Sequence, residues 1–366
     1  MKEISLRHEK ARKLMSSKDL SALILGTSDN LQYLMDVTEP SIHTCGVAVI
    51  PQQGQPVLAV MWLDKEAVQN HLKEIDVKTY TPDDEGAIIT RILEQLGVTK
   101  GTIGLDDRTL AVLANSLKKS LPQTNLVNAS NIIDELKWIK SEEEIRMIQK
   151  ACEIADQAMK IAIESLTPGM TELQVAALVE NHMMGLGSDQ FKHRTIIASG
   201  PRTKFIHPMA THKKIVKGEV VTLDFGAVYE VYCSDIARTF VTGNPSEELK
   251  GFKALHSAQE AILWKLRPGI SIKEVETIGQ KKLEEAGYHL VGHVGHNIGL
   301  KVEEHPRLRT TRNPYPSATL EENMAIAFFQ SSIQSDECLG IRLEDTVIIN
   351  SNGAKTLTNY PRELFT

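Results

Sequence analysis

The sequence contains few cysteines and few aromatic residues. Its 366 residues include four cysteines, and no two of them share the CxxC spacing of a metal or redox motif. Cysteines this scattered favour reduced thiols, and they argue against a disulfide framework or a thiolate-bound zinc cluster. We therefore expect each of the four to be a small buried hydrophobic residue. They are Cys45, Cys152, Cys233 and Cys338.

The sequence also lacks the segments that direct a chain to membranes or to nucleic acid. Residues 1–14 are rich in charge and carry no apolar core of a signal peptide, and no apolar run reaches the roughly 18 residues of a membrane span. The net charge is −6 and no dense block of lysine and arginine is present, so a phosphate backbone has no basic surface to bind. We predict a cytoplasmic protein whose partner is a peptide or another small molecule.

The composition that remains is that of an ordinary globular protein, with 42% hydrophobic and 24% charged residues. At about 150 residues per domain, the length suggests two domains. Between residues 20 and 131 short apolar runs alternate with helical stretches, which predicts an α/β layer. The predicted strands are residues 22–24, 46–50, 57–60 and 102–105. This part shows no evident chemistry, and His43, His71 and Asp106 are expected at the surface or in packing.

A capping box marks the start of the second domain. Ser141 and Glu144 stand three residues apart, immediately before the amphipathic run 145–166. A hydroxyl residue followed at this spacing by glutamate satisfies two free N–H groups at the start of a helix. We therefore predict that a long helix begins here and that the chain forms domains at 1–133 and 134–366.

Beyond this boundary the sequence repeats a helix, a Pro-Gly turn and a second helix. Residues 166–171 (Leu-Thr-Pro-Gly-Met-Thr) are echoed by residues 266–271 (Leu-Arg-Pro-Gly-Ile-Ser). In each copy the Pro-Gly ends one helix and the hydroxyl residue after it caps the next. Two structurally related halves are therefore expected, with a cleft between them. The capping pairs are Thr171 with Gln174 and Ser271 with Glu274.

Two aspartates lie within apolar, strand-like segments of the first half. Asp224 follows Val-Val-Thr-Leu, and Asp235 precedes Ile-Ala-Arg-Thr-Phe. A hairpin that turns at Tyr229-Glu230 would place the two carboxylates opposite each other, about 5 Å apart at Cβ. Carboxylates at that distance repel each other unless a cation lies between them, which predicts a divalent metal. The alternative, a solvated strand face, is disfavoured because aspartate is uncommon within apolar strands.

The second half supplies two further candidate ligands. His296 stands in Gly-His-Asn-Ile-Gly-Leu, and Glu344 stands in Arg-Leu-Glu-Asp-Thr. Carboxylates with one imidazole suit Mn, Co, Zn or Fe, whereas thiolate chemistry is not indicated. The residues taken by themselves indicate a metal-dependent hydrolase.

Four motifs together resemble the signature of the pita-bread superfamily, which includes prolidase, aminopeptidase P, methionine aminopeptidase and creatinase. They are Asp224-Phe-Gly, Ser-Asp235 with Arg-Thr-Phe behind it, Gly-His296-x-x-Gly-Leu and Arg-x-Glu344-Asp-Thr. The lead-in at 139–145 and the α/β half also resemble prolidase and aminopeptidase P, while methionine aminopeptidase lacks such an N-terminal domain. The resemblance implies an α/β N-terminal domain of the creatinase/prolidase type. It also implies an α+β pita-bread C-terminal domain with an internal pseudo-two-fold repeat.

The resemblance further implies a metal centre, residue by residue. Asp224 and Asp235 become metal ligands, His296 becomes a ligand to the first metal, and Glu344 becomes a bridging ligand with a catalytic role. Divalent Mn, Co or Zn held there would activate water and polarise the scissile carbonyl. A homodimer is implied as well.

Three residues are assigned to the substrate. The resemblance makes His207, in Phe-Ile-His-Pro, the catalytic histidine that steadies the substrate or the tetrahedral intermediate. Taken alone, His207 is equally an exposed loop histidine. Arg342, two residues before Glu344, and Glu303 are also expected to contact the substrate.

Two positions depart from the family pattern. The family's Glu-Pro-Gly ligand falls at position 329, where this chain has Phe329 followed by Gln330. Counting from Gly299, the family's His-Glu pair falls at Glu303-Glu304, so a second imidazole is replaced as well. Loss of a ligand weakens one metal position, which leaves two ions, one ion or none as alternatives. We expect Glu303 either to fill the gap as a ligand or to face solvent or substrate.

Three functions remain open from the sequence. The first is a metal-dependent peptidase for short Xaa-Pro peptides, like prolidase or aminopeptidase P, in which Glu344 or a neighbouring carboxylate takes the proton. The second is a hydrolase or lyase of another small molecule on the same scaffold, with one metal or none. The third is a binding module. The retained carboxylates and imidazole favour a metal, whereas the two replacements argue against ordinary peptidase turnover.

Overall fold

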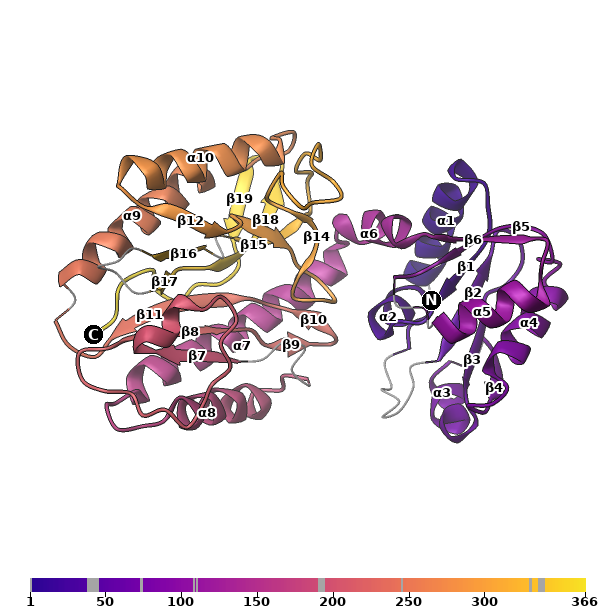
Figure 1. The fold of residues 1–366 in the computed structure, drawn as a ribbon, viewed down its shortest axis with the longest axis horizontal. Coiled ribbons are helices and arrows are strands. Elements are labelled where there is room, and N and C mark those ends of the chain that lie inside the picture. Colours follow the sequence, from indigo (N-terminus) through magenta and orange to yellow (C-terminus); the bar gives the residue numbers. More distant parts are fainter. Residues whose placement is uncertain are drawn as a thin grey trace. The chain divides into compact units, whose positions relative to one another are not determined.

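A computed structural model of the chain describes residues 2–37, 46–72, 75–107, 109, 111–189, 195–244, 246–328, 331–334 and 340–366. The chain divides into two compact units, residues 1–137 and 138–366, each with its own sheets (Figure 1). The boundary between residues 133 and 134 stays a prediction. Among the described residues, no helix combines the length and the apolar character that a membrane crossing needs.

The first unit is built on a mixed six-stranded sheet with the order β4-β3-β2-β1-β5-β6. Strand β2 runs antiparallel to β1 and β3, and the remaining pairs are parallel. The central strands are almost wholly buried, which explains their continuous apolar runs. All four predicted strands are confirmed, as β1, β2, β3 and β5. The elements are α1 (Lys2–Ser17), β1 (Leu20–Leu25), α2 (Ser28–Met35), β2 (Val47–Pro51), β3 (Val57–Met61), η1 (Trp62–Asp64), α3 (Lys65–His71), β4 (Asp76–Tyr80), α4 (Glu85–Gln95), β5 (Gly101–Leu105), α5 (Ala111–Ser120), β6 (Thr124–Asn128) and α6 (Ser130–Trp138).

The second unit combines antiparallel sheets with two pairs of long helices. Its sheets have the orders β11-β8-β7, β12-β16-β17 and β14-β13-β15-β18-β19, and β9 pairs with β10. In Figure 1, α7 and α8 lie beside the first sheet, and α9 and α10 cover the other half. The elements are α7 (Glu142–Ser165), α8 (Glu172–Gly185), β7 (Ile196–Ser199), η2 (Gly200–Lys204), β8 (Val220–Phe225), β9 (Val228–Tyr229), β10 (Tyr232–Cys233), β11 (Ile236–Val241), α9 (Ser246–Leu263), α10 (Ile272–Glu285), β12 (His289–Gly292), β13 (Gly295–Asn297), β14 (Glu304–Arg307), β15 (Ala325–Phe328), β16 (Ser331–Gln334), β17 (Ile341–Arg342), β18 (Asp345–Asn350) and β19 (Gly353–Thr356).

The predicted helix starts are present. Ser141 caps α7 with a complete capping box, and Thr171 does the same for α8. Ser271 caps α10 through a hydrogen bond that its hydroxyl accepts from the backbone N–H of Glu274, at 3.1 Å. Each cap satisfies backbone donors that the first helical turn cannot pair.

The two halves of the second unit repeat the same backbone contacts. Gly169 donates its N–H to the carbonyl of Ile215, which donates back to Met170. In the other half, Gly269 donates to the carbonyl of Leu320, which donates back to Ile270. Both glycines have positive φ, 100° and 87°, a conformation that glycine adopts without steric cost. The sequence repeat is therefore a structural repeat.

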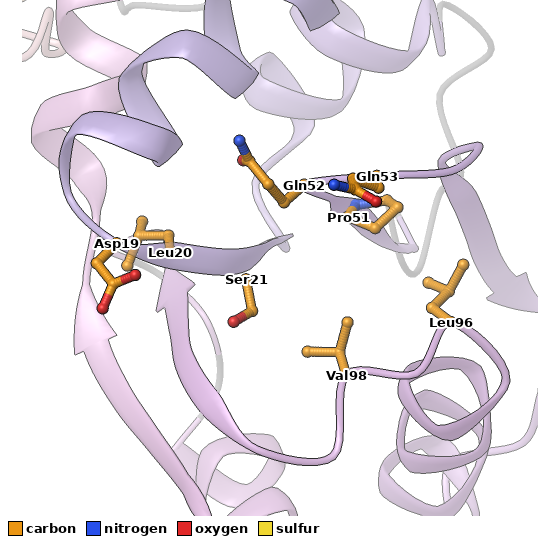
Figure 2. Close-up of a pocket in the computed structure, with 8 residues that line it drawn as sticks. All are labelled: Asp19, Leu20, Ser21, Pro51, Gln52, Gln53, Leu96 and Val98. Carbon is orange, nitrogen blue, oxygen red and sulfur yellow. The ribbon is translucent and has the colours of Figure 1, made fainter.

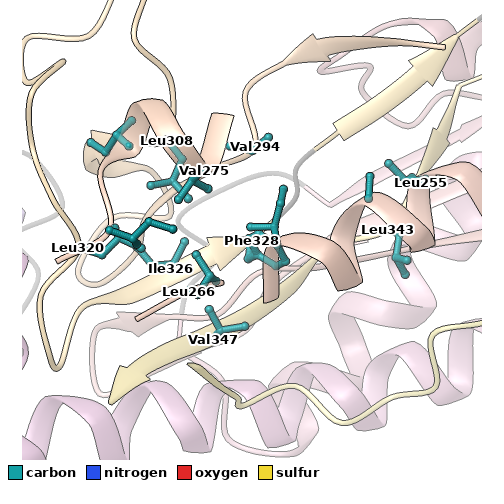
Figure 3. Close-up of a cluster of buried hydrophobic side chains, with 14 of the residues drawn as sticks. Leu255, Leu266, Val275, Val294, Leu308, Leu320, Ile326, Phe328, Leu343 and Val347 are labelled. Atoms are coloured by element: carbon teal, nitrogen blue, oxygen red, sulfur yellow. The ribbon is translucent and has the colours of Figure 1, made fainter. Parts of the chain in front are cut away.

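Each half also has its own hydrophobic core. One core joins α7 and α8 to the sheet of β7, β8 and β11. The other lies under α9 and α10, where Phe328 is wholly buried among residues such as Leu255 and Val347 (Figure 3). The first core contains Ile236, next to Asp235, and the second contains Val294 and Leu343, near His296 and Glu344. Each segment that carries a candidate ligand is therefore anchored in one of the two cores.

The hairpin that carries the two aspartates turns one residue later than predicted. Its turn residues are Glu230 and Val231, and both have positive φ, 44° and 70°. Asp224 therefore lies opposite Ala237 and not opposite Asp235, so the expected register was wrong. Positive φ at both central residues is typical of a type I′ turn, whose twist suits a hairpin. Because neither residue is glycine or asparagine, no local pattern in the sequence indicates this turn.

Candidate metal centre

Three buried side chains from separate parts of the second unit meet at one point. Asp235, His296 and Glu344 each offer a ligand atom, and these atoms lie within 4.8 Å of one another. Nε2 of His296 is 3.8 Å from Oδ2 of Asp235 and 3.9 Å from Oε1 of Glu344. Each residue is at most 1% exposed. Three of the four predicted metal ligands therefore form one cluster.

Backbone pairing places these side chains together. Asp235 directly precedes β11, His296 lies in β13, and Glu344 lies between β17 and β18. Ala237 and Glu344 exchange backbone hydrogen bonds at 3.2 and 3.1 Å. The hydroxyl of Thr346 accepts a hydrogen bond from the N–H of Asp235 at 3.0 Å and donates to its carbonyl at 2.8 Å. The two carboxylates are thereby fixed side by side on neighbouring strands.

The imidazole of His296 is held in the tautomer that a metal requires. Its Nδ1 lies 3.0 Å from the carbonyl oxygen of Asn297, which can only accept, so Nδ1 carries the hydrogen. The lone pair of the neutral ring is then at Nε2, which has no hydrogen-bond partner among the described residues. Burial, followed by the neighbouring His293, lowers the pKa of His296, and Asp235 opposes this shift. A neutral imidazole is the form that binds metal ions.

Glu344 is a buried acid whose carboxylate forms no hydrogen bond with the described residues. It is 0% exposed, and neither carboxylate oxygen has a hydrogen-bond partner among the described residues. Burial, followed by the charges of Asp235 and Asp224, raises the pKa of Glu344 well above its ordinary value. A cation between these carboxylates would favour the ionised form again.

The fourth predicted ligand, Asp224, is engaged by an arginine. Arg342 donates from Nη1 to Oδ2 of Asp224, and both residues are at most 2% exposed. Its Nη2 donates to the carbonyl oxygens of Phe205, at 2.8 Å, and of Ile206. The guanidinium therefore connects Asp224 to the loop that carries His207. Direct contact between Arg342 and substrate stays a prediction.

His207 is exposed on this loop. The carboxylate of Glu172 forms hydrogen bonds with residues before and after His207. Glu172, the first residue of α8, is 0% exposed. It accepts hydrogen bonds from the N–H and hydroxyl of Ser199 at 2.8 and 3.0 Å, and from those of Thr211 at 3.1 and 2.7 Å. Nε of Arg202 contacts both of its oxygens. Residues on either side of His207 are thus joined at one carboxylate.

Glu303 lies outside the cluster of Asp235, His296 and Glu344. Its Oε1 accepts a hydrogen bond from Nε of Arg307 at 2.7 Å and lies 3.3 Å from Nε2 of His293. Its side chain is 38% exposed. The carboxylate is therefore directed to two neighbouring side chains, and its contact with substrate stays a prediction.

The cluster fits one divalent cation. Nε2 of His296 and both carboxylate oxygens of Glu344 are buried and have no hydrogen-bond partner among the described residues, and a metal ion would satisfy all three. The donor set of two carboxylates and one imidazole suits Mn, Co, Zn or Fe. Asp235, His296 and Glu344 would hold the ion.

Some predictions concern residues outside the described part of the chain. These are His43, Cys45, Phe329, Gln330 and Cys338. Within the described part, Cys152 and Cys233 are buried and form no disulfide, as predicted.

The first unit contains a separate pocket, and its lining has no cluster of metal-ligating side chains. Its volume is about 300 Å³, and it is lined by Asp19, Leu20, Ser21, Pro51, Gln52, Gln53, Leu96 and Val98 (Figure 2). Asp19 is the single ionisable residue in this lining.

Asp106 of the same unit is buried and accepts hydrogen bonds from the N–H groups of Gly26 and Thr27. It therefore has a packing role, as predicted.

Two residues of the site were missed by sequence reasoning. His293 stands three residues before His296, and its ring packs against that ligand with 5.6 Å between ring centroids. The repeated histidine at this spacing was a signal that could have been used. Glu172 is the helix residue directly after the cap Thr171, where an acidic residue is ordinarily explained by the helix dipole. No local pattern distinguishes it.

Two family models together match most of the chain. Residues 146–351 match the model of metallopeptidase family M24, and residues 7–139 match the creatinase/prolidase N-terminal domain. The chain is 33% identical to the Xaa-Pro dipeptidase of Pyrococcus furiosus over 361 residues, which cover 98% of this chain and 99% of that protein.

Solved structures agree with this match. The prolidase from Pyrococcus horikoshii OT3 superposes with a TM-score of 0.86 at 32% identity, covering 98% of this chain and 99% of that one. An Xaa-Pro dipeptidase from Bacillus anthracis gives a TM-score of 0.89 at 26% identity and covers 99% of both chains. The two-domain pita-bread architecture is confirmed. The chain belongs to metallopeptidase family M24.

Proposed function

We propose that this protein is a metal-dependent peptidase that cleaves short Xaa-Pro peptides. Membership of family M24 makes it a hydrolase of the metallopeptidase class, and full-length relatives carry the name Xaa-Pro dipeptidase. The observation that carries the proposal is the cluster of Asp235, His296 and Glu344, whose ligand atoms converge in the buried interior.

One divalent ion is the proposed complement of this site. Asp235, His296 and Glu344 supply three ligand groups, while Asp224 is already paired with Arg342. Position 329, where the family places a further carboxylate, is phenylalanine in this sequence. Three side chains leave positions open for substrate or water, as in catalytic rather than structural metal sites.

Glu344, His207 and Arg342 have separate roles in the proposed hydrolysis. A divalent ion at this site supplies Lewis acidity to the scissile carbonyl and to water. Glu344, whose carboxylate oxygens have no hydrogen-bond partner among the described residues, accepts the proton released by water. His207, exposed on its loop, donates a hydrogen bond to the developing oxyanion. Arg342 holds that loop in position through the carbonyls of Phe205 and Ile206.

A second candidate is hydrolysis of another small molecule on the same fold. One observation favours it, because a carboxylate at position 303 replaces the imidazole that the family pattern predicts. A screen of amide and amidine substrates would separate the two candidates. A homodimeric state and a cytoplasmic location are further parts of the proposal.

The test combines metal content with a substrate screen. Purified protein loaded with Mn, Co or Zn is measured by elemental analysis and assayed on Xaa-Pro dipeptides and tripeptides. We expect about one ion per chain and cleavage before proline, and we expect both to be lost in Asp235→Ala and in His296→Ala.

A matched control removes an acid outside the site. Glu164 on α7 has a side chain that is 57% exposed, so Glu164→Gln should retain metal and activity. Thermal unfolding checks that each variant is folded. Protein that binds no metal under any loading and cleaves no Xaa-Pro peptide would overturn the proposal.

A further inference from the structure

Arg238 connects the two backbone segments that carry Asp235 and Glu344. The residue is 0% exposed and lies in β11, which begins directly after Asp235. Its Nη1 donates to the carbonyl oxygen of Ala237 at 2.8 Å and to that of Glu344 at 2.7 Å. Ala237 and Glu344 already exchange backbone hydrogen bonds, so the guanidinium adds a second link between the same two residues.

The remaining donors of Arg238 bind Asp345 and a segment close to residue 360. Nη2 donates to Oδ1 of Asp345 at 2.8 Å and to the carbonyl oxygen of Tyr360 at 2.6 Å, and Nε donates to that of Pro361 at 2.8 Å. A guanidinium has five N–H groups in a planar fork, and here all five are used. Lysine has three donors on one nitrogen, so it cannot make the same set of bonds.

Thr358 connects the same segment to both ligands by a second route. The residue is 2% exposed, and its hydroxyl donates to Oδ1 of Asp345 at 2.8 Å and accepts from the N–H of Thr346 at 3.2 Å. The hydroxyl of Thr346 in turn bonds to the N–H and the carbonyl of Asp235. One hydroxyl therefore fixes the backbone next to Glu344 and, through Thr346, the backbone of Asp235.

These backbone contacts matter because the ligand end of Glu344 has no support of its own. Its carboxylate oxygens have no hydrogen-bond partner among the described residues. A functional site requires its groups to be held within about 0.5 Å of their working positions. Residues that orient metal ligands typically change metal affinity about 10–100-fold when they are replaced.

We propose that Arg238 and Thr358 are positioning residues of the metal centre, which hold the backbones of Asp235 and Glu344 at the separation that one ion bridges. The segment 358–361 thereby acts on metal binding, although none of its residues belongs to the ligand cluster. This inference rests on the proposed function because it requires the proposed ion, but it does not depend on the substrate.

The test compares the metal affinity of two variants of Thr358. Thr358→Val keeps the shape of the side chain and removes the hydroxyl, whereas Thr358→Ser keeps the hydroxyl. Calorimetric titration of the metal-free protein with Mn²⁺ measures the Kd of the ion. We expect Thr358→Val to raise this Kd about tenfold and Thr358→Ser to stay within about threefold of the original protein.

A buried hydroxyl in the first unit supplies the matched control. Thr90 in α4 is 8% exposed and donates to the carbonyl oxygen of Gly86 at 2.7 Å. Thr90→Val should leave the Kd of Mn²⁺ unchanged, because the ligand cluster lies in the second unit. Urea unfolding measures the stability of each variant, and the titrations are made where each is folded. A loss of stability alone therefore does not change the Kd.

Arg238→Lys tests the guanidinium, and hydrogen exchange gives a readout that needs no metal. Three donors replace five, so the Kd of Mn²⁺ should rise more than about tenfold in folded Arg238→Lys. In the metal-free protein the amides of Asp235 and Glu344 lie within these contacts. Both should exchange faster in Thr358→Val and at the original rate in Thr90→Val. If Arg238→Lys does not fold, the variants of Thr358 decide the question.

The outcomes separate this inference from the proposed function. If the original protein binds Mn²⁺ but cleaves no Xaa-Pro peptide, the peptidase proposal fails, and a raised Kd in Thr358→Val still supports the inference. An unchanged Kd in folded Thr358→Val overturns the inference and leaves the peptidase proposal intact. Equal weakening in Thr358→Val and Thr358→Ser also overturns it, because the hydroxyl would not be the cause. An original protein that binds no Mn²⁺ would overturn both.

Discussion

Glu344 and Asp345 are adjacent acids in the same chain segment, and both are 0% exposed, yet their surroundings are opposite. Asp345 accepts hydrogen bonds from Nη2 of Arg238 and the hydroxyl of Thr358, each at 2.8 Å, and lies 3.0 Å from Nε of Arg362. The carboxylate oxygens of Glu344 have no hydrogen-bond partner among the described residues. Successive residues of an extended segment point to opposite faces, so neighbours in sequence meet different environments.

The difference separates a structural acid from one prepared for a ligand. A buried carboxylate is stable when cations and donors of the protein surround it, as for Asp345. Glu344 instead faces Asp235 and His296, and its pKa is raised by burial and by neighbouring negative charge. Among the described residues, no donor forms a hydrogen bond with its carboxylate oxygens, so a bound cation would supply the interaction that Asp345 receives from the protein.

The largest effect is expected from breaking the paired acid. Asp345→Ala leaves the guanidinium of Arg238, which is 0% exposed, without its charged partner. Removing one member of a buried pair typically costs about 3–5 kcal/mol of unfolding free energy. Urea unfolding of the metal-free protein followed by circular dichroism measures this loss. A change below about 1 kcal/mol would contradict the structural role assigned to Asp345.

The next effect concerns the acid without a partner. Glu344→Gln removes a buried acid whose ionised form is disfavoured, so the metal-free variant should be as stable as the original protein or more stable. Added metal should stabilise the original protein by about 2.7 kcal/mol at a hundredfold excess over Kd, and should not stabilise Glu344→Gln. Thermal unfolding with and without Mn or Zn measures both. Equal metal-induced shifts in the two proteins would remove Glu344 from the ligand set.

A third buried acid, Glu172, is held by several neutral donors together with one arginine. Glu172 accepts four hydrogen bonds from Ser199 and Thr211 and contacts Arg202. Glu172→Gln keeps the shape but turns one acceptor into a donor, so we expect a loss of about 2 kcal/mol. Hydrogen exchange at the amides of Ser199 and Thr211 should accelerate. Unchanged exchange would show that Glu172 does not hold the loop of His207.

The smallest effect is expected at an exposed pair. Lys150 and Glu153 on α7 lie 3.2 Å apart, with side chains 47% and 45% exposed. Water and salt screen such pairs, so Lys150→Ala should change the unfolding free energy by less than about 0.5 kcal/mol. The same urea titration measures it. If Lys150→Ala lost as much unfolding free energy as Asp345→Ala, the energetic contribution of an ion pair would not depend on its burial.

Local patterns in the sequence predicted much of the fold. Four of the six strands of the first unit, and the caps at Ser141, Thr171 and Ser271, follow from neighbouring residues alone. The repeated Pro-Gly turn predicted the two halves for the same reason. The hairpin register was missed because Glu230 and Val231 adopt positive φ without the residues that usually permit it.

By itself the sequence determined the elements, the repeat and the identity of Asp235, His296 and Glu344, because periodicity, caps and motif spacing act over short distances. Only the tertiary structure decided which of these residues meet. Asp224 pairs with Arg342, Glu303 pairs with Arg307 and faces His293, and Glu344 lacks the partners that its neighbour Asp345 has. Asp224 and Arg342 are 118 residues apart in the sequence, so no local pattern encodes their contact. The contacts of Glu303 and Glu344 depend on how β13, β14 and β18 are arranged, which only the tertiary structure shows.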